Sequence, residues 1–146
     1  MGWTEDLAYG NFWEKKAIEL LDKNKDGKIE LTPTNIKFSE YDFKFNQIAY
    51  ECKADRRASK TRNLAIEYEC SGNPSGIQTT EAENYIIFII HSLTRACCCN
   101  IPVKELKELC KNAYKTSAFN GKNKLYLVPI DSIPTENFLV KQHVFV

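Results

Sequence analysis

Two runs separated by Asn46-Gln47 decide the fold of this chain: Glu40-Tyr41-Asp42-Phe43-Lys44-Phe45 and Ile48-Ala49-Tyr50-Glu51-Cys52-Lys53-Ala54-Asp55. In the first run, aromatic residues alternate with charged residues, which is the pattern of a strand with one buried face. With Asn46-Gln47 as a two-residue loop, the runs pair as a β-hairpin. In that register Asp42 faces Glu51, and Glu40 faces Lys53.

The opposed carboxylates of Asp42 and Glu51 indicate a metal site. Like charges directly opposite each other destabilise a strand pair, unless a divalent cation lies between them. Oxygen-only ligands suit Mg²⁺ or Mn²⁺. Glu51 and Lys53 project from the same face because side chains alternate along a strand. The ammonium beside the acids can orient a water or stabilise charge on a phosphate, so the pattern predicts phosphodiester hydrolysis.

The same residues resemble the PD-(D/E)XK nuclease superfamily, whose core is Asp42 followed by Glu51-Cys52-Lys53 in this chain. The N-terminal Gly10-Asn11-Phe12-Trp13-Glu14 is similar to the archaeal Holliday-junction resolvase and phage-type branches. Two later runs resemble small nucleases of phages and large DNA viruses: Lys53-Ala54-Asp55 through Glu69, and Pro74-Ser75-Gly76 through Ala82. The resemblance covers Gly10 to His91. It departs at two points, since no proline precedes Asp42 and Arg62 stands where glycine is expected.

The resemblance implies an α/β fold with a restriction-endonuclease-like core, a mixed β-sheet flanked by helices. It implies that Asp42, Glu51 and the backbone carbonyl of Cys52 hold Mg²⁺ (or Mn²⁺), with Glu14 as an additional ligand. Lys53 would position or activate the attacking water. The expected activity is a metal-dependent DNA endonuclease, with a DNA junction or flap among the candidate substrates. A homodimer is compatible with this expectation.

Glu14 lies within a predicted helix over Asn11–Leu21. Its apolar arc contains Trp13, Ala17, Ile18, Leu20 and Leu21, and Glu14 falls inside that arc. A carboxylate that faces a core is costly unless it is paired or metal-bound. Two interpretations stay open: a ligand near Asp42, or a glutamate whose stem packs at the helix edge.

Basic residues follow the acidic pair at Arg56, Arg57, Lys60 and Arg62. Clustered cations beside a metal site hold the phosphate backbone of DNA without reading its sequence. The alternative is a solvated charged loop. The pattern therefore predicts DNA contact here. No membrane partner is expected, because no apolar run is long enough to span a membrane.

Composition narrows the class of protein. The chain has 146 residues and a net charge of +1, which predicts a single domain over 1–146 and no bulk attraction to nucleic acid. No apolar stretch has the pattern of a signal peptide or a membrane span. We therefore expect an intracellular protein, in the cytoplasm or nucleus of a host cell or in a bacterial cytoplasm. The vicinal Cys97-Cys98-Cys99 favours buried thiols over a zinc site.

A rival motif spans Asp22 to Glu30, which matches the first nine positions of an EF-hand loop. The twelfth position, normally a bidentate glutamate, is Pro33, so a calcium-binding function ranks lower. The other alternative is a catalytically inactive nuclease-fold protein, such as a viral accessory factor that binds nucleic acid or a protein partner.

The remaining elements follow from periodicity and turn signals. Thr80-Glu81-Ala82-Glu83 has the pattern of a capping box that opens a short helix.

Glu67 and Glu69 either enlarge the acidic site or lie at a sheet rim. His91 and His143 are interpreted as structural residues. We expect strands at Lys28–Leu31, Ile36–Phe38, Leu64–Glu69 and Tyr85–His91, a helix over Pro102–Lys115 with a lysine face, and a last strand at Lys124–Ile130.

Overall fold

The computed structural model describes residues 3–24, 29–31 and 41–144 of the chain. The predicted strand at Ile36–Phe38 and the side chain of Glu40 lie outside these residues. The helices are α1 (Trp3–Asn24), α2 (Ala58–Thr61) and α3 (Val103–Lys111), with three single 3₁₀ turns, η1 (Gly76–Gln78), η2 (Ile130–Ser132) and η3 (Thr135–Asn137). The strands are β1 (Ile29–Leu31), β2 (Phe43–Phe45), β3 (Ile48–Asp55), β4 (Asn63–Cys70), β5 (Asn73–Pro74), β6 (Asn84–Ile90), β7 (Arg95–Pro102), β8 (Tyr114–Ala118), β9 (Asn123–Pro129) and β10 (Phe138–Val144).

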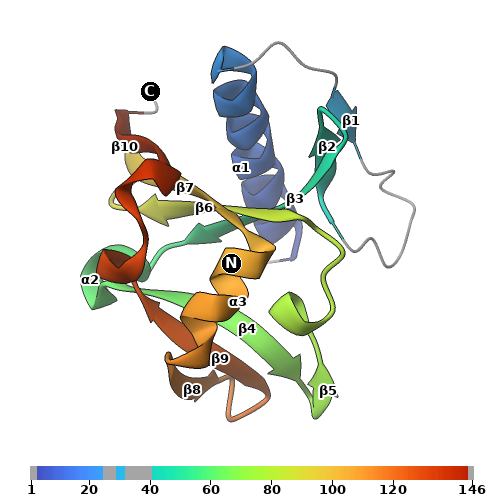
Figure 1. The fold of residues 1–146 in the computed structure, drawn as a ribbon, viewed down its shortest axis with the longest axis vertical. Coiled ribbons are helices and arrows are strands. Elements are labelled where there is room, and N and C mark those ends of the chain that lie inside the picture. The colour runs from blue at the N-terminus through green and yellow to red at the C-terminus, as the bar shows by residue number, and fades with distance from the viewer. Residues whose placement is uncertain (1–2, 25–28, 32–40, 145–146) are drawn as a thin grey trace.

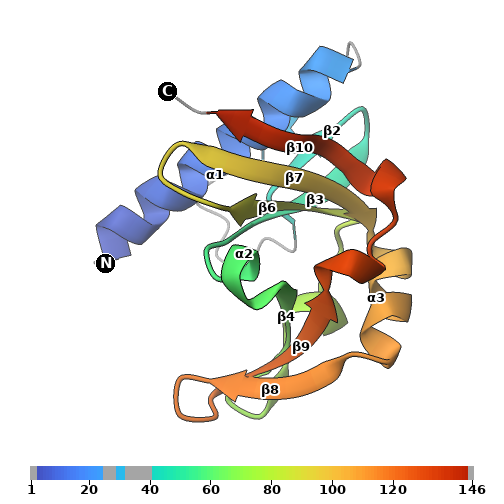
Figure 2. The same ribbon diagram turned by 90° about the vertical axis from the view of Figure 1, so that its left-hand side faces the viewer.

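The strands form two sheets. The six-stranded sheet has the order β1-β2-β3-β6-β7-β10 and is mixed, because β3 and β6 pair in parallel while the other neighbours are antiparallel. The four-stranded sheet, β5-β4-β9-β8, is antiparallel. Helix α1 covers one face of the mixed sheet, and the second sheet lies on the other side (Figures 1 and 2). The expected α/β architecture, a mixed sheet flanked by helices, is confirmed at this level.

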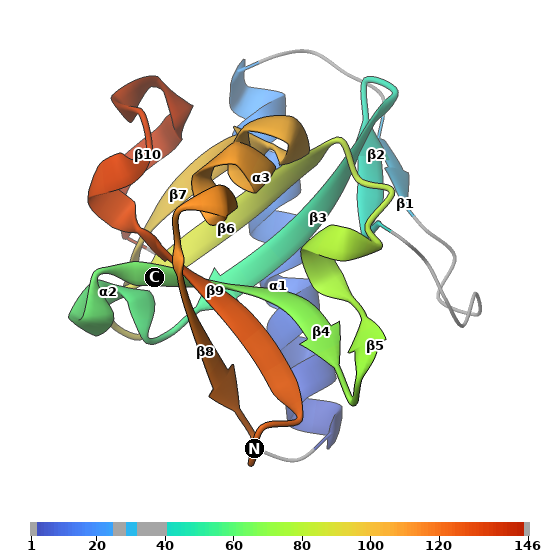
Figure 3. The same ribbon diagram turned by 60° about the horizontal axis from the view of Figure 1, so that its bottom comes forward.

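The predicted hairpin is confirmed in its register. Phe43 pairs with Tyr50, and Phe45 pairs with Ile48. Asn46 and Gln47 both have positive φ, 52° and 67°, which is the backbone of a two-residue turn that suits the right-handed twist of a hairpin. After β3 the chain leaves the mixed sheet, forms α2 and enters the second sheet as β4, as Figure 3 shows.

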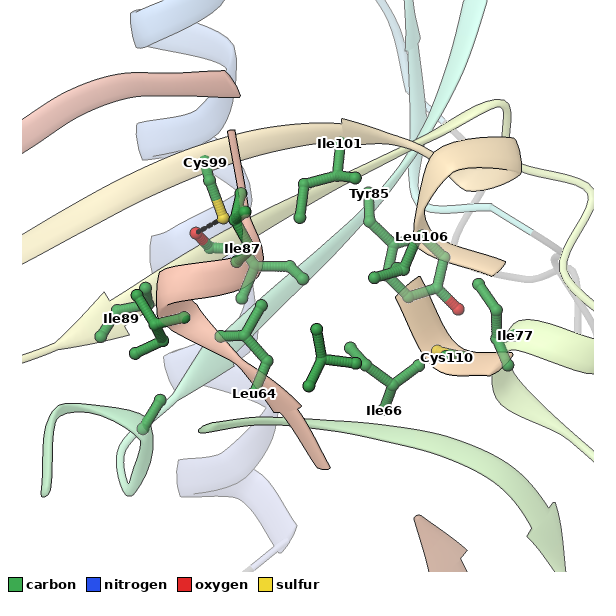
Figure 4. Packing of buried hydrophobic residues seen from close by; sticks show 14 of the residues in the cluster. Leu64, Ile66, Ile77, Tyr85, Ile87, Ile89, Cys99, Ile101, Leu106 and Cys110 are labelled. Carbon is green, nitrogen blue, oxygen red and sulfur yellow. Dashed lines mark hydrogen bonds between the residues drawn. The ribbon is translucent and has the colours of Figure 1, made fainter. Parts of the chain in front are cut away.

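Two apolar clusters lie on the two faces of the mixed sheet. On the first face, Trp13, Ala17 and Leu20 of α1 pack against Phe43 and Phe88. On the second face, the mixed sheet packs against the second sheet and α3, and Figure 4 shows the side chains that meet there: Leu64, Ile66, Ile77, Tyr85, Ile87, Ile89, Cys99, Ile101, Leu106 and Cys110. Glu51 and Lys53 belong to this second face, because they pair with Tyr85 and Ile87 across the β3–β6 ladder.

The predicted helix at Thr80–Glu83 is wrong. A capping box requires the N–H of its fourth residue to bond the first side chain, but the N–H of Glu83 donates to the carbonyl of Ala49 at 2.8 Å. The Thr80 hydroxyl accepts from Ala82 instead, at 3.1 Å. Glu83 is thereby drawn to the sheet, where β6 begins at the next residue.

Two further elements differ from the sequence-based expectation. Helix α3 ends at Lys111, and Tyr114–Ala118 forms β8, which pairs with β9. Lys115 therefore leaves the predicted lysine face and lies over the rings of Tyr68 and Tyr126, each centroid 5.9 Å from Nζ. The predicted last strand at Lys124–Ile130 corresponds to β9, which is followed by β10 along the edge of β7.

The three vicinal cysteines lie in β7, with Cys98 and Cys99 buried and Cys97 half-buried. The thiols are free. Over the described residues, the longest helix is too polar to be a membrane span.

Candidate active site

Asp42 lies immediately before β2 and is fixed to β3 by two hydrogen bonds. Its backbone N–H donates to the carbonyl of Tyr50 at 2.8 Å. Its Oδ2 accepts from the backbone N–H of Cys52, also at 2.8 Å. The N–H and C=O of one strand residue point to the same edge of the strand. The Cys52 carbonyl therefore points to the side of β3 where Asp42 lies, beyond the end of β2. The structure thus brings together two of the predicted metal-binding groups.

Glu51 and Lys53 form an ion pair on the neighbouring face of β3. Lys53 Nζ lies 3.3 Å from Glu51 Oε1. The Glu51 side chain is 19% exposed and the Lys53 side chain is 54% exposed. The carboxylate is therefore largely withdrawn from water, whereas about half of the Lys53 side chain surface stays in contact with solvent.

The three acids of the predicted site share one electrostatic environment. Burial, reinforced by Asp42 and then Glu51, raises the pKa of Glu14 from 4.5 to about 7. Burial raises the pKa of Asp42 against the opposing effects of the Cys52 N–H and Lys53. Burial also raises the pKa of Glu51, with Lys53 opposing and Asp42 adding to the rise. Each carboxyl group thus resists ionisation where it lies, chiefly because burial disfavours its charged form.

The same acids favour the charged form of Lys53. Burial works to lower the pKa of Lys53, but Glu51 and Asp42 outweigh it and raise that pKa above its ordinary value. Lys53 therefore stays an ammonium at neutral pH. It can donate hydrogen bonds and stabilise negative charge, which are the roles expected of it beside a phosphate.

A cavity of about 370 Å³ opens next to Lys53, between β3 and β4. Its polar lining comes from Lys53, Asp55, Arg56, Arg57 and Glu67. Its apolar wall includes Leu64, Ile66, Tyr85 and Ile87, which belong to the second core cluster. The cavity thus joins the ammonium of Lys53 to two of the four predicted DNA-binding residues.

Asp55 fixes the turn that contains these two arginines, and the sequence-based reasoning did not single it out. Its Oδ1 accepts from the N–H groups of Arg57 and Ala58, at 3.0 and 2.9 Å. Its Oδ2 accepts from the N–H of Ala65 at 3.1 Å. The carboxylate therefore ties the turn after β3 to β4. An aspartate three residues before a short Ala-Ser-Lys run is a turn signal that would have identified it.

The four predicted DNA-binding residues separate into two groups. Arg56 and Arg57 line the Lys53 cavity, and the Arg56 guanidinium lies 4.2 Å from the Tyr9 ring centroid. Lys60 is exposed on α2. Arg62 ends α2 with a φ of 63°, and its guanidinium lies 3.3 Å from Asp131. That left-handed backbone explains why glycine is the residue expected at this position.

Glu67 faces the Lys53 cavity from β4. Its Oε2 accepts from the Ser75 hydroxyl at 3.0 Å, and its Oε1 accepts from the Asn123 amide. Gly76 has a φ of +52°, and a Cβ there would lie 2.2 Å from the Glu67 carbonyl oxygen. Ser75-Gly76 is thus the tight turn that holds Glu67, while Glu69 pairs with Lys124 at 3.1 Å.

The donor set at the hairpin fits a hard divalent cation. Glu14, Asp42 and Glu51 supply carboxylate oxygens, and Cys52 supplies a carbonyl, all of them ligands that Mg²⁺ and Mn²⁺ accept. Burial raises the pKa of each of the three acids, so a bound cation would offset the cost of ionising them. In the part of the chain that is described, no three histidine, cysteine or acidic side chains are close enough to enclose an ion.

The EF-hand-like segment is only partly described. Asp22 lies within α1, which runs on to Asn24, and Glu30 lies in β1 opposite Lys44. The segment after the loop thus joins a sheet, where an EF-hand has an exiting helix. Residues 25–28 and Pro33 lie outside the described residues.

Comparison of the chain with protein-family models, with curated proteins and with solved structures finds no match.

Proposed function

We propose that this protein is a Mg²⁺-dependent (or Mn²⁺-dependent) DNA endonuclease with a restriction-endonuclease-like core. One observation carries the proposal: Lys53 pairs with Glu51 on β3, and the half-buried carboxyl of Asp42 is bonded to the backbone of Cys52 between them. Asp42 is fixed to the Cys52 N–H at 2.8 Å, and Lys53 lies 3.3 Å from Glu51. Carboxyl groups whose pKa values are raised beside a specific charged partner mark a candidate functional site.

Asp42, Glu51 and the Cys52 carbonyl would hold the metal ion, with Glu14 as an additional ligand. When bound, the ion supplies Lewis-acid stabilisation of the phosphate and lowers the pKa of a water. Lys53 acts as a hydrogen-bond donor that orients the attacking water and stabilises the charge that develops on the phosphate. It does not act as the base while it remains protonated. Glu51 holds Lys53 in position through their ion pair.

DNA is the substrate that the surroundings of Lys53 favour. Arg56 and Arg57 line the same cavity as Lys53, and Arg56 is held against Tyr9. Guanidinium groups bind phosphate oxygens in a bidentate manner. With Lys53 included, three cations thus lie along one wall that a phosphodiester backbone can follow.

A second candidate is a nuclease-fold protein that binds nucleic acid without cleaving it. The separation of the carboxylates favours it, because over the described residues no three metal-binding side chains converge. The two candidates share the basic wall at Arg56 and Arg57 and differ in turnover.

The test is single-turnover cleavage of duplex, junction and flap DNA by purified protein in Mg²⁺, compared with Lys53→Ala. Loss of one transition-state contact lowers the rate by about 100-fold or more, so we expect that decrease at saturating metal while metal affinity persists. Lys115→Ala is the matched control, since Lys115 lies on β8, over Tyr68 and Tyr126. DNA binding without cleavage by the wild-type protein would establish the second candidate.

A further inference from the structure

A second cavity, of about 420 Å³, lies where the β6–β7 turn meets the η2 turn. Its reactive and charged lining consists of Arg62, His91, Cys97 and Asp131. Its apolar lining consists of Ile130, Ile133 and Phe138. It shares no lining residue with the Lys53 cavity, so it requires an explanation apart from the proposed nuclease activity.

His91 and Cys97 form a close pair in this cavity. His91 follows β6 and Cys97 lies in β7, and the backbone N–H of His91 donates to the carbonyl of Arg95 at 2.9 Å. The turn therefore folds the two side chains onto one face, where His91 Nε2 lies 3.0 Å from Cys97 Sγ. Imidazole beside a thiol is the arrangement that activates a cysteine nucleophile, because the ring takes the thiol proton.

Arg62 provides a binding group for an anion beside the thiol. Its guanidinium lies 3.3 Å from Asp131, and both side chains are well exposed, at 58% and 87%. Exposed ion pairs contribute about 1 kcal/mol or less, so a carboxylate of a ligand can replace Asp131. The backbone N–H of Ile130 donates to the Arg62 carbonyl at 2.9 Å, which keeps this wall in place.

We propose that Cys97 is a thiol-exchange site for small acidic disulfides, with His91 as the proton acceptor and Arg62 as the carboxylate-binding residue. The Cys97 sulfur attacks one sulfur of the disulfide, and a new S–S bond forms as the old one breaks. The thiol proton passes to His91 and then to the leaving thiolate. Cys97 is oxidised and the leaving sulfur is reduced, so the disulfide itself is the oxidant.

The surrounding charges favour assistance by His91 over a preformed thiolate. Burial raises the pKa of the Cys97 thiol, and Arg62 lowers it by less. Over the described residues, the charged and titratable groups nearest Cys97 are His91, Arg62, Asp131 and the buried thiols of Cys98 and Cys99. The exchange rate should therefore depend on His91 and on a negative charge in the reagent.

The test uses two chromogenic disulfides, the dianionic dithiobis(nitrobenzoic acid) and the uncharged dithiodipyridine, on the full-length protein at pH 7. Cys97→Ser should remove the fastest phase with both reagents, whereas Cys70→Ser, at another half-buried thiol, should retain it. His91→Gln should slow that phase by at least about tenfold with both reagents. Arg62→Gln should slow only the dianionic reagent, by about fivefold, and Asp131→Asn should accelerate it.

Peptide mass spectrometry after brief labelling locates the mixed disulfide, and circular dichroism confirms that each variant is folded. The proposal is overturned if another cysteine carries the label first. It is equally overturned if His91→Gln leaves the fastest phase unchanged, or if Arg62→Gln affects both reagents alike.

Discussion

The backbone N–H of Cys52 donates to Asp42 Oδ2 at 2.8 Å. This bond fixes the carboxylate that precedes β2 against the backbone of β3, at the residue that follows Glu51. The acid is held by a neutral donor, so its negative charge is not cancelled there. Lys53 compensates part of that charge, and the remainder is available to a cation.

Asp42→Asn and Asp42→Ala should have opposite effects on the stability of the metal-free protein. Asparagine retains an oxygen that accepts from Cys52 while it removes the buried charge, so thermal unfolding in EDTA should occur at a higher temperature. Alanine leaves the Cys52 N–H without that acceptor, which costs about 1–3 kcal/mol. Isothermal titration calorimetry should show loss of Mg²⁺ binding in both variants. Unchanged Mg²⁺ affinity in Asp42→Asn would remove Asp42 from the ligand set.

Glu14 should make the stability of the metal-free protein depend on pH. Its pKa is about 7 in the folded protein and 4.5 as the ordinary value. Between these values the folded state keeps the proton that the unfolded chain releases, so stability falls as pH rises through this window. Glu14→Gln should flatten the fall, measured by thermal unfolding in EDTA. Saturating Mg²⁺ should flatten it in the wild-type protein. A wild-type curve that Glu14→Gln leaves unaltered would place the glutamate at the helix edge.

Gly76 should be the least replaceable of the described glycines. Gly76→Ala places a Cβ 2.2 Å from the Glu67 carbonyl oxygen at a φ of +52°, so backbone strain and overpacking should together cost roughly 3 kcal/mol. Gly72→Ala is the matched control, because its φ is +82° with no atom within 4 Å of the Cβ, and strain alone costs about 1 kcal/mol. Urea unfolding measures both. Equal destabilisation by the two changes would contradict the tight turn as the support of Glu67.

Removal of the charges of Arg56 and Arg57 should flatten the salt dependence of DNA binding. Each lost phosphate contact reduces the slope of log affinity against log salt by about one unit. Binding is measured by fluorescence anisotropy in Ca²⁺, so that cleavage does not interfere. The matched control is the double change Lys104→Gln and Lys122→Gln. It removes the same charge from exposed positions that do not line the Lys53 cavity. Lys60→Gln with Arg62→Gln should have a smaller effect. If the Arg56 and Arg57 changes leave the slope intact, the DNA path lies elsewhere.

The hairpin and its acids could be predicted from the sequence because local chemistry determines them. Alternating aromatic residues set the buried face of β2, and Asn46-Gln47 accepts the positive φ values that the turn needs. The same register places Asp42 beside β3, where it accepts from the Cys52 N–H. The strand at Leu64–Glu69 and the buried strand at Tyr85–His91 were predictable for the same reason, and they correspond to β4 and β6.

The remaining fold depends on partners distant in sequence. The Thr80–Glu83 capping box is overridden by the bond from Glu83 to Ala49, and the helix predicted through Lys115 is cut short by pairing of β8 with β9. Propensity is a weak predictor where tertiary contacts compete. The hydrogen bonds from Ser75 and Asn123 to Glu67, and the contact of His91 with Cys97, likewise arise only when separate segments meet. A turn between two apolar strands at Ser92-Leu93-Thr94 was the signal that could have paired His91 with Cys97.

Cleavage of DNA in Mg²⁺ by wild-type protein and by Asp42→Asn, purified in parallel, tests the central claim most directly. Asparagine preserves the bond to Cys52 and removes only the charge, so both proteins should fold and bind DNA in Ca²⁺ alike. We predict metal-dependent cleavage by the wild-type protein and less than a tenth of that rate in the variant. Equal cleavage by both preparations, or none by either while DNA is bound, would contradict the assignment of Asp42, Glu51 and Lys53 as a nuclease site.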